Sequence, residues 1–354
     1  MKEYQPLLIK KFSKKSYKNT ELKRLKKFKL DKTIDLKSSC NAIRICESHN
    51  NIVTFFASDK IVHFDLTTDI TNEKYPHLKD VITAGNLRKD GKIIYAGLAN
   101  GVVNMYDAGK KSCLRSYSGY HKLQINSIDI ADNLVNFVSC SNDLSIKIFD
   151  SSRQEPVHSI EKAHSDYINV TKFLDDNILI SGGNDKIIKI WDLRTENKRK
   201  PVKTFDNMSI NNDILILKSR ESFISTAENN LNLFDLRTDK LIYQANPMQS
   251  SIRRIVTDIT QSRIFAVPSG ENFVKCIELG VVPSVTMKNL YSLKFPKEIS
   301  SFDISADMNR YAVSYLDGEI MIKSRNVEEE DEELYKDQED KDIEYLEYEF
   351  YLSC

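Results

Sequence analysis

LSIKIFD (residues 144–150) and IIKIWD (residues 187–192) end in the same apolar–aromatic–aspartate pattern, and their closing aspartates lie 42 residues apart. The same ending occurs three more times, at IVHFD, VVNMYD and LNLFD. The intervals between neighbouring copies are 42, 43, 42 and 43 residues, and the closing residues are Asp65, Asp107, Asp150, Asp192 and Asp235. Two weaker copies follow, FVKCIE ending at Glu278 and EIMIKS ending at Ser324. The chain is therefore an array of seven repeated units.

The length of the repeat predicts the fold. Units of about 40–45 residues are typical of β-propellers, in which each blade is a sheet of four short strands. The third unit contains four short runs with turn residues between them, namely NSIDIADN, NFVSCSND, LSIKIFD and PVHSIEK. The sequence therefore predicts an all-β protein, a seven-bladed β-propeller of the WD-repeat type.

The composition is that of a globular chain. It has 354 residues, 41% of them apolar, with 16 Tyr and 16 Phe to fill a large core. No window approaches the 18 or so apolar residues of a membrane span, and the first residues, MKEYQPLLIKK, lack the apolar core of a secretory signal. The six cysteines are scattered, which indicates reduced thiols in an intracellular compartment. We expect no membrane partner.

Charge divides the chain into three parts. Residues 1–32 hold twelve Lys or Arg against three acids, and residues 326–354 hold thirteen acids against two Lys. We therefore expect a basic N-terminal arm (1–32), a propeller (33–325) and an acidic tail (326–354). A strand from the chain end can close a propeller by covering the edge of the last blade. We expect Tyr4–Phe12 to supply that strand.

Both tails have more than one interpretation. The arm can contact RNA, act as a nuclear import signal or be a solvated segment without a partner. Its candidate RNA or import contacts are Lys10, Lys11, Lys14, Lys15, Arg24, Lys26 and Lys27. The tail is either a solubilising acidic segment or an acidic–aromatic peptide that folds on a partner.

Residues 40–325 resemble the WD-repeat family. In that family a His, a Ser or Thr, a turn Asp and a Trp form a hydrogen-bonded network within a blade. The matching residues are His164, Ser181, Asp185 and Trp191 in the fourth unit, and His121, Ser139 and Asp143 in the third, where Phe149 replaces the Trp. A His–Asp pair can be catalytic, but recurrence at the repeat period favours a structural network.

The search for catalytic motifs finds none. The sequence has no phosphate loop, no G-x-S-x-G elbow and no H-E-x-x-H helix. Gly182 and Gly183 fit a hairpin, and Asp175 and Asp176 fit a turn between strands. We therefore predict no catalytic residue, metal, cofactor or small-molecule substrate. Two alternatives stay open: an adaptor such as a ubiquitin-ligase substrate receptor, and a propeller enzyme with a site at the channel mouth.

Four stretches resemble one WD-repeat family in particular, the propeller subunits of the UtpA subcomplex of the small-subunit processome. They are Tyr4–Tyr17, Arg88–Asp107, Val138–Ile168 and Asp317–Arg325. The resemblance implies a nucleolar, ribonucleoprotein-bound scaffold for pre-ribosomal RNA processing and 40S subunit biogenesis. Its partners would be other propeller and helical subunits, with pre-ribosomal RNA as a further candidate. Family members carry a helical C-terminal domain after the propeller, and only 29 residues follow Arg325 here.

Overall fold

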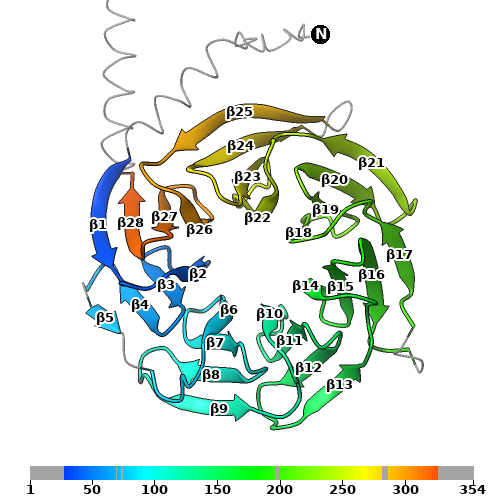
Figure 1. The fold of residues 1–354 in the computed structure, drawn as a ribbon, viewed down its shortest axis with the longest axis horizontal. Coiled ribbons are helices and arrows are strands. Elements are labelled where there is room, and N and C mark those ends of the chain that lie inside the picture. The colour runs from blue at the N-terminus through cyan, green and yellow to red at the C-terminus, as the bar shows by residue number, and fades with distance from the viewer. Residues whose placement is uncertain (1–27, 69, 73–74, 196–199, 281–285, 326–354) are drawn as a thin grey trace, which may run out of the picture.

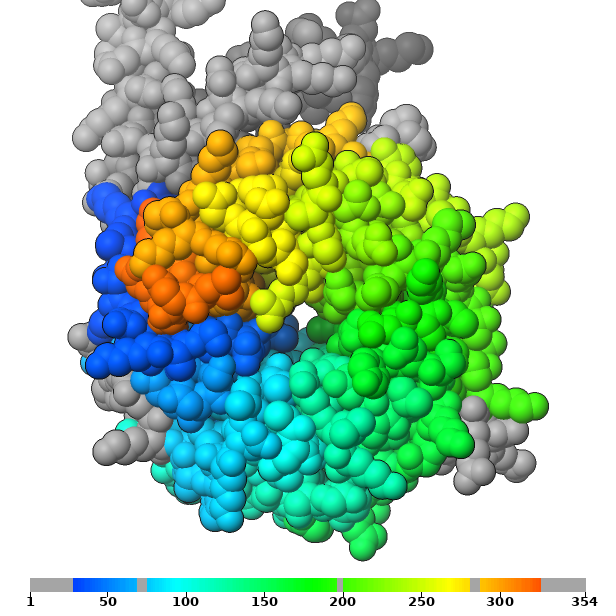
Figure 2. All heavy atoms as spheres, in the orientation of Figure 1, coloured from blue at the N-terminus to red at the C-terminus, as the bar shows by residue number. Residues whose placement is uncertain are grey.

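The computed structural model describes residues 28–325, except 69, 73–74, 196–199 and 281–285. In these residues, strands form seven antiparallel sheets of four strands each, arranged as blades around a central channel (Figure 1). The space-filling view shows the opening at the centre of the ring (Figure 2). The predicted seven-bladed β-propeller is confirmed. Within the described residues there is no helix long and apolar enough to cross a membrane.

In six of the blades, the four strands lie in chain order, from the innermost strand at the channel to the outermost strand. Blade one consists of β2 (Cys40–Ile45), β3 (Ile52–Ala57), β4 (Ile61–Asp65) and β5 (Ile70–Asn72). Blade two consists of β6 (Ile82–Leu87), β7 (Ile93–Leu98), β8 (Val103–Asp107) and β9 (Cys113–Tyr117). Blade three consists of β10 (Ile125–Ile130), β11 (Asn136–Ser141), β12 (Ile146–Asp150) and β13 (Pro156–Ile160). Blade four consists of β14 (Ile168–Asp175), β15 (Ile178–Gly183), β16 (Ile187–Asp192) and β17 (Lys203–Asp206). Blade five consists of β18 (Ile214–Ile216), β19 (Ser222–Ala227), β20 (Asn230–Asp235) and β21 (Lys240–Ala245). Blade six consists of β22 (Ile252–Thr257), β23 (Arg263–Pro268), β24 (Phe273–Gly280) and β25 (Thr286–Lys294).

The last blade combines both ends of the described chain. It consists of β26 (Ile299–Ile304), β27 (Arg310–Tyr315), β28 (Glu319–Ser324) and, on the outside, β1 (Lys29–Asp35). β1 pairs antiparallel with β28, from Lys29 opposite Ser324 to Asp35 opposite Glu319. An N-terminal strand therefore closes the ring, but it is not the one that we expected. Tyr4–Phe12 lies outside the described residues, and the outer position of this blade is taken by Lys29–Asp35.

The repeated sequence ending marks the third strand of each blade. β4, β8, β12, β16 and β20 all end at the aspartate of the pattern, and β28 ends at Ser324. The weakest copy, at Glu278, lies inside β24, which continues to Gly280. The apolar residues of these strands are buried between neighbouring blades; in blade three, for example, Phe137 and Phe149 stack with ring centroids 4.9 Å apart. Burial of this apolar surface supplies the main stabilising free energy.

A series of side-chain hydrogen bonds joins each of the first six blades to the next blade along the channel. In each contact the donor is a side chain that lies in the innermost strand or, in blade five, just before that strand. It donates to a backbone carbonyl oxygen of the following blade, at a distance of 2.6–3.0 Å. The six donor–acceptor pairs are Asn41–Ile82, Thr83–Ile125, Asn126–Ile168, Asn169–Asn211, Asn212–Ile252 and Arg253–Ser300. We call these contacts the inter-blade clasps.

Candidate functional site

Blade four contains the complete hydrogen-bonded network. His164 precedes β14, Ser181 lies in β15, Asp185 lies in the β15–β16 turn and Trp191 lies in β16. His164 Nδ1 lies 2.9 Å from both carboxylate oxygens of Asp185, and His164 Nε2 lies 2.7 Å from Ser181 Oγ. Trp191 Nε1 donates to the same Ser181 Oγ at 2.8 Å. With the imidazole proton on Nδ1, Ser181 donates to Nε2 and each group of the network is satisfied.

Blade three has the same network without the indole. His121 Nδ1 lies 3.0 Å from Asp143 Oδ2, and its Nε2 lies 2.9 Å from Ser139 Oγ. Ser145 adds a hydroxyl that donates to Asp143 at 2.7 Å. Phe149, at the position of the Trp, packs against aromatic rings instead. Hydrogen bonding is therefore replaced by ring packing at this end of the network.

The networks are sealed from solvent. His164 is 2% exposed and Ser181 is fully buried. Burial raises the pKa of Asp185, but the hydrogen bond from His164 and those from the backbone N–H groups of Ile187 and Ser165 outweigh burial, so the pKa lies below its ordinary value. The buried imidazole therefore holds this carboxylate in place in the β15–β16 turn.

Blade five contains a variant of the network that the sequence reasoning missed. Asn207 stands 28 residues before Asp235, just as His164 stands 28 residues before Asp192. Its Oδ1 accepts from Ser225 Oγ at 2.6 Å and from Asn232 Nδ2 at 3.2 Å. The repeat spacing could have located Asn207, but a search restricted to His passes over it.

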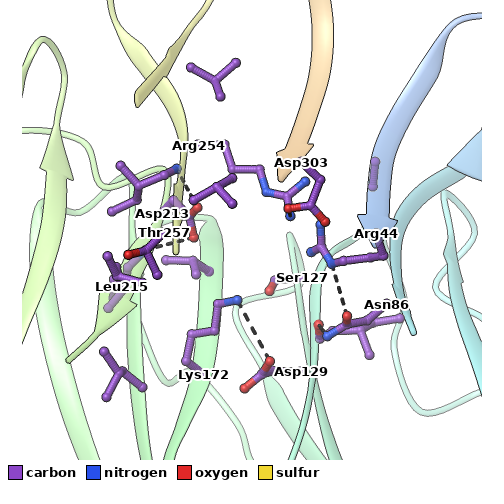
Figure 3. Close-up of a pocket in the computed structure, with 18 of the residues that line it drawn as sticks. Arg44, Asn86, Ser127, Asp129, Lys172, Asp213, Leu215, Arg254, Thr257 and Asp303 are labelled. Carbon is purple, nitrogen blue, oxygen red and sulfur yellow. Dashed lines mark hydrogen bonds and ion pairs between the residues drawn. The ribbon is translucent and has the colours of Figure 1, made fainter. Parts of the chain in front are cut away.

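The central channel is lined by the innermost strands of all seven blades and has a volume of about 1050 Å³. Charged and polar side chains from facing strands point into it (Figure 3). Those at equivalent positions of successive innermost strands include Arg44, Asn86, Asp129, Lys172 and Asp303. We take this channel, into which charged and polar side chains point, as the candidate site of the molecule.

Three channel carboxylates each hold the backbone of another blade. Asp129 accepts from Phe173 N at 2.9 Å, and Asp213 accepts from Ile255 N at 3.0 Å. Asp303 accepts from Ile45 N at 2.9 Å and so joins the last blade to the first. These carboxylates have a structural role in the ring.

Two channel arginines converge on one acceptor. Arg44 Nη1 donates to Ile43 O at 2.9 Å, and Arg254 Nη1 donates to the same oxygen at 3.1 Å. Burial, followed by the charge of Arg254, lowers the pKa of Arg44 to about 10. The two guanidinium groups therefore repel each other in a partly desolvated site.

Ion pairs connect the loops at one mouth of the channel. Lys89 lies 3.6 Å from Glu47 and 2.9 Å from Asp132, and Arg220 also pairs with Asp132. Arg220 and Asp132 belong to blades five and three, so this pair spans blade four.

The predicted RNA or import contacts, Lys10 to Lys27, lie outside the described residues, as does the acidic tail. Among residues that the structure describes, no group of three His, Cys, Asp or Glu side chains is placed to hold a metal ion.

Comparison with known proteins agrees with the repeat and the geometry. The profile of the WD domain, G-beta repeat, matches residues 111–150 and 154–192, which include the networks of blades three and four. The chain is a seven-bladed propeller that contains WD repeats. A chain of the "Crystal Structure of Mitotic Checkpoint Complex" has the same fold, with a TM-score of 0.72 at 14% identity, over 92% of this chain and 96% of that one.

The WD-repeat propeller also has similar curated relatives. The "U3 small nucleolar RNA-associated protein 15 homolog" of Xenopus laevis is 26% identical over 72% of this chain and 48% of the relative. "U3 small nucleolar RNA-associated protein 15" of Saccharomyces cerevisiae is 24% identical over 58% of this chain and 40% of the relative. The "WD repeat-containing protein 55 homolog" of Drosophila ananassae is 24% identical over 49% of this chain and 36% of the relative. The chain spans about half the length, or less, of these relatives.

Proposed function

We propose that this WD-repeat propeller is a non-catalytic scaffold subunit of the small-subunit processome, acting in pre-ribosomal RNA processing and 40S subunit biogenesis in the nucleolus. The observation that carries the proposal is the similarity over 72% of the chain to a U3 small nucleolar RNA-associated protein 15 homolog. The yeast relative has the same designation, which ties the similarity to one kind of protein across distant organisms.

The geometry supports a scaffold role. The ring is closed by β1, the blades are joined by the clasps, and the channel carboxylates bind backbone N–H groups. The His–Asp pairs are buried, so they stabilise blades and do not face a substrate. A rigid ring with loops on both faces holds several partners at fixed relative positions.

The partners that we propose are other UtpA-type propeller and helical subunits of the processome, together with pre-ribosomal RNA. The basic arm would supply the RNA contacts, because Lys and Arg neutralise phosphates and the interleaved aromatic residues can stack on unpaired bases.

The test is purification of the tagged full-length protein from its own cells, followed by identification of the bound proteins and RNA. Processome proteins and pre-ribosomal RNA precursors should be enriched over a tagged unrelated propeller. Enrichment of ubiquitin-ligase subunits without ribosome-assembly proteins would reject the proposal in favour of the adaptor alternative.

A separate experiment tests the arm. Replacing the seven candidate cations, Lys10 to Lys27, by Gln should weaken binding to a single-stranded pre-ribosomal RNA fragment and flatten the plot of log affinity against log salt. The slope should fall by about 0.7 for each phosphate that the arm no longer neutralises. The matched control replaces the six lysines of this set by Arg, which keeps the charge. An unchanged slope in the Gln variant would exclude the arm as an RNA contact.

A further inference from the structure

The central channel contains cations that the channel carboxylates do not neutralise in full. Arg254 Nη2 and Asp303 Oδ1 are 3.9 Å apart, and so are Lys172 Nζ and Asp129 Oδ1. Both distances exceed the hydrogen-bonding range. The carboxylates of Asp303 and Asp129 instead accept hydrogen bonds from the backbone of other blades, and Asp213 does the same.

The interior of the channel carries more positive than negative side chains. The residues that line the channel include seven cations and six carboxylates; the cations are Arg44, Lys89, Lys172, Lys218, Arg220, Arg253 and Arg254, and the carboxylates are Glu47, Asp129, Asp132, Asp213, Asp258 and Asp303. The charged groups are partly accessible from the channel, since the side chain of Arg254 is 21% exposed and that of Lys172 is 26% exposed.

Arg44 and Arg254 lie close together in the channel. Because both Nη1 atoms donate to the carbonyl oxygen of Ile43, they are no more than 6.0 Å apart. Figure 3 shows the two guanidinium groups beside each other, with the carboxylate of Asp303 between them, and Lys172 lower in the view, where it points to Asp129. Arginine presents several donors in a planar fork that fits carboxylate and phosphate oxygens.

We propose that the central channel binds a small oxyanion, a phosphate or a carboxylate, held by Arg44 and Arg254 with Lys172 as the third cation. The bound anion reduces the repulsion between the guanidinium groups and supplies acceptors for their remaining N–H donors. The volume of the channel, about 1050 Å³, leaves space for a compound larger than the oxyanion itself. The site is independent of the proposed processome function, because it depends only on the channel of the propeller.

The test measures thermal unfolding and isothermal titration of the full-length protein with inorganic phosphate, pyrophosphate, citrate and chloride at constant ionic strength. The expected result is binding of phosphate compounds or citrate, with a rise in the melting temperature that chloride does not give. Stronger binding of the phosphate compounds than of citrate, or the reverse, shows whether the site takes a phosphate or a carboxylate. Equal effects of all four anions, or of none, would overturn the proposal.

Two variants locate the site. Arg44→Gln combined with Arg254→Gln should weaken oxyanion binding at least tenfold. Arg194→Gln should bind as the wild type does, because Arg194 is an exposed residue after β16 that pairs with Asp192. Unweakened binding in the double variant contradicts the assignment to these arginines.

If the double variant does not fold, modification of the wild-type protein by the arginine reagent phenylglyoxal gives the same information. Mass spectrometry should show that the preferred oxyanion protects Arg44 and Arg254 but not Arg194. Equal modification with and without the oxyanion would rule out the site.

Discussion

At the scale of single residues, His164 connects a loop, a strand and a turn of blade four through contacts of 2.7–2.9 Å. His164→Ala removes these contacts and leaves the carboxylate of Asp185 partly buried without its imidazole. We expect the free energy of unfolding to fall by about 1–3 kcal/mol, since buried polar groups left without partners are costly. Urea denaturation measures the change, and binding of partners by the folded variant should be retained. A variant with unchanged stability but abolished activity would overturn the structural role.

Trp191→Phe is a milder change in the same network. It removes only the hydrogen bond from the indole to Ser181, and blade three is already built with Phe149 at this position. We expect a loss of about 1 kcal/mol beyond the change in packing, smaller than that of His164→Ala. A larger loss than for His164→Ala, measured by the same urea titration, would show that the indole and not the imidazole organises the blade.

The network of blade three makes stability depend on acid pH. Burial raises the pKa of Asp143, but hydrogen bonds from His121 and Ser145 outweigh burial and hold that pKa well below its ordinary value of 3.8. Since the carboxylate is stabilised in the folded state, its contribution is complete above about pH 4 and is lost as the pH falls further. Asp143→Asn should therefore reduce stability at pH 7 and flatten its decrease between pH 4 and pH 2. The exposed Glu155→Gln serves as control; the same flattening there would refute the assignment.

The networks illustrate what sequence can and cannot predict about single residues. His164 and Asp185 could be placed in one network because their types recur at the repeat spacing. The channel residues could not be singled out in this way, because Arg44, Asn86 and Asp129 share one position of the repeat but have no residue type in common, and no single strand shows whether that position faces the channel. That depends on the register of seven strands at once.

At the scale of the strands, the inter-blade clasps attach the innermost strand of each of the first six blades to the next blade. Asn126 donates to Ile168 O of blade four at 2.7 Å and to Asn142 Oδ1 at 2.6 Å. Asn126→Ala leaves both acceptors without this donor, so we expect a loss of about 1–2 kcal/mol in the free energy of unfolding. Hydrogen exchange should show faster opening of β14 as well as β10. Asn177→Ala, at an exposed position of the β14–β15 turn, is the control, and equal effects of the two substitutions would argue against the clasp.

The clasps also show why these hydrogen bonds between blades could not be predicted from the sequence. Asn41, Asn126 and Asn169 recur near the repeat period, but Thr83 and Arg253 make the equivalent contact with different side chains. Ser300, at this position of the last blade, shares a hydrogen bond with Ser314 of its own blade instead. The recurring feature is a donor at one place in space, and a search by residue type finds only part of the set.

At the scale of the whole molecule, the sequence predicted closure by the N-terminal side of the chain but placed the strand too early. The apolar run of Tyr4–Phe12 suggested a strand, whereas Lys29–Asp35 is polar and largely exposed. An outer strand with one face in solvent needs few apolar residues. Its position is set by the connection, because β1 leads directly into β2 of the first blade and so joins the two ends of the ring.

Ring closure can be tested by two deletions that differ by nine residues. Removal of residues 1–26 keeps β1 and Phe28, whose ring lies 4.9 Å from that of Tyr311, so the melting temperature should stay close to that of the full-length protein. Removal of residues 1–35 exposes the edge of β28, which loses six paired positions and the apolar packing of Ile34. We expect a fall in melting temperature of about 10 °C or more and a concentration-dependent association through the free edge. Thermal unfolding and sedimentation velocity measure both effects. If the two deletions behave alike, the strand Lys29–Asp35 does not hold the ring closed.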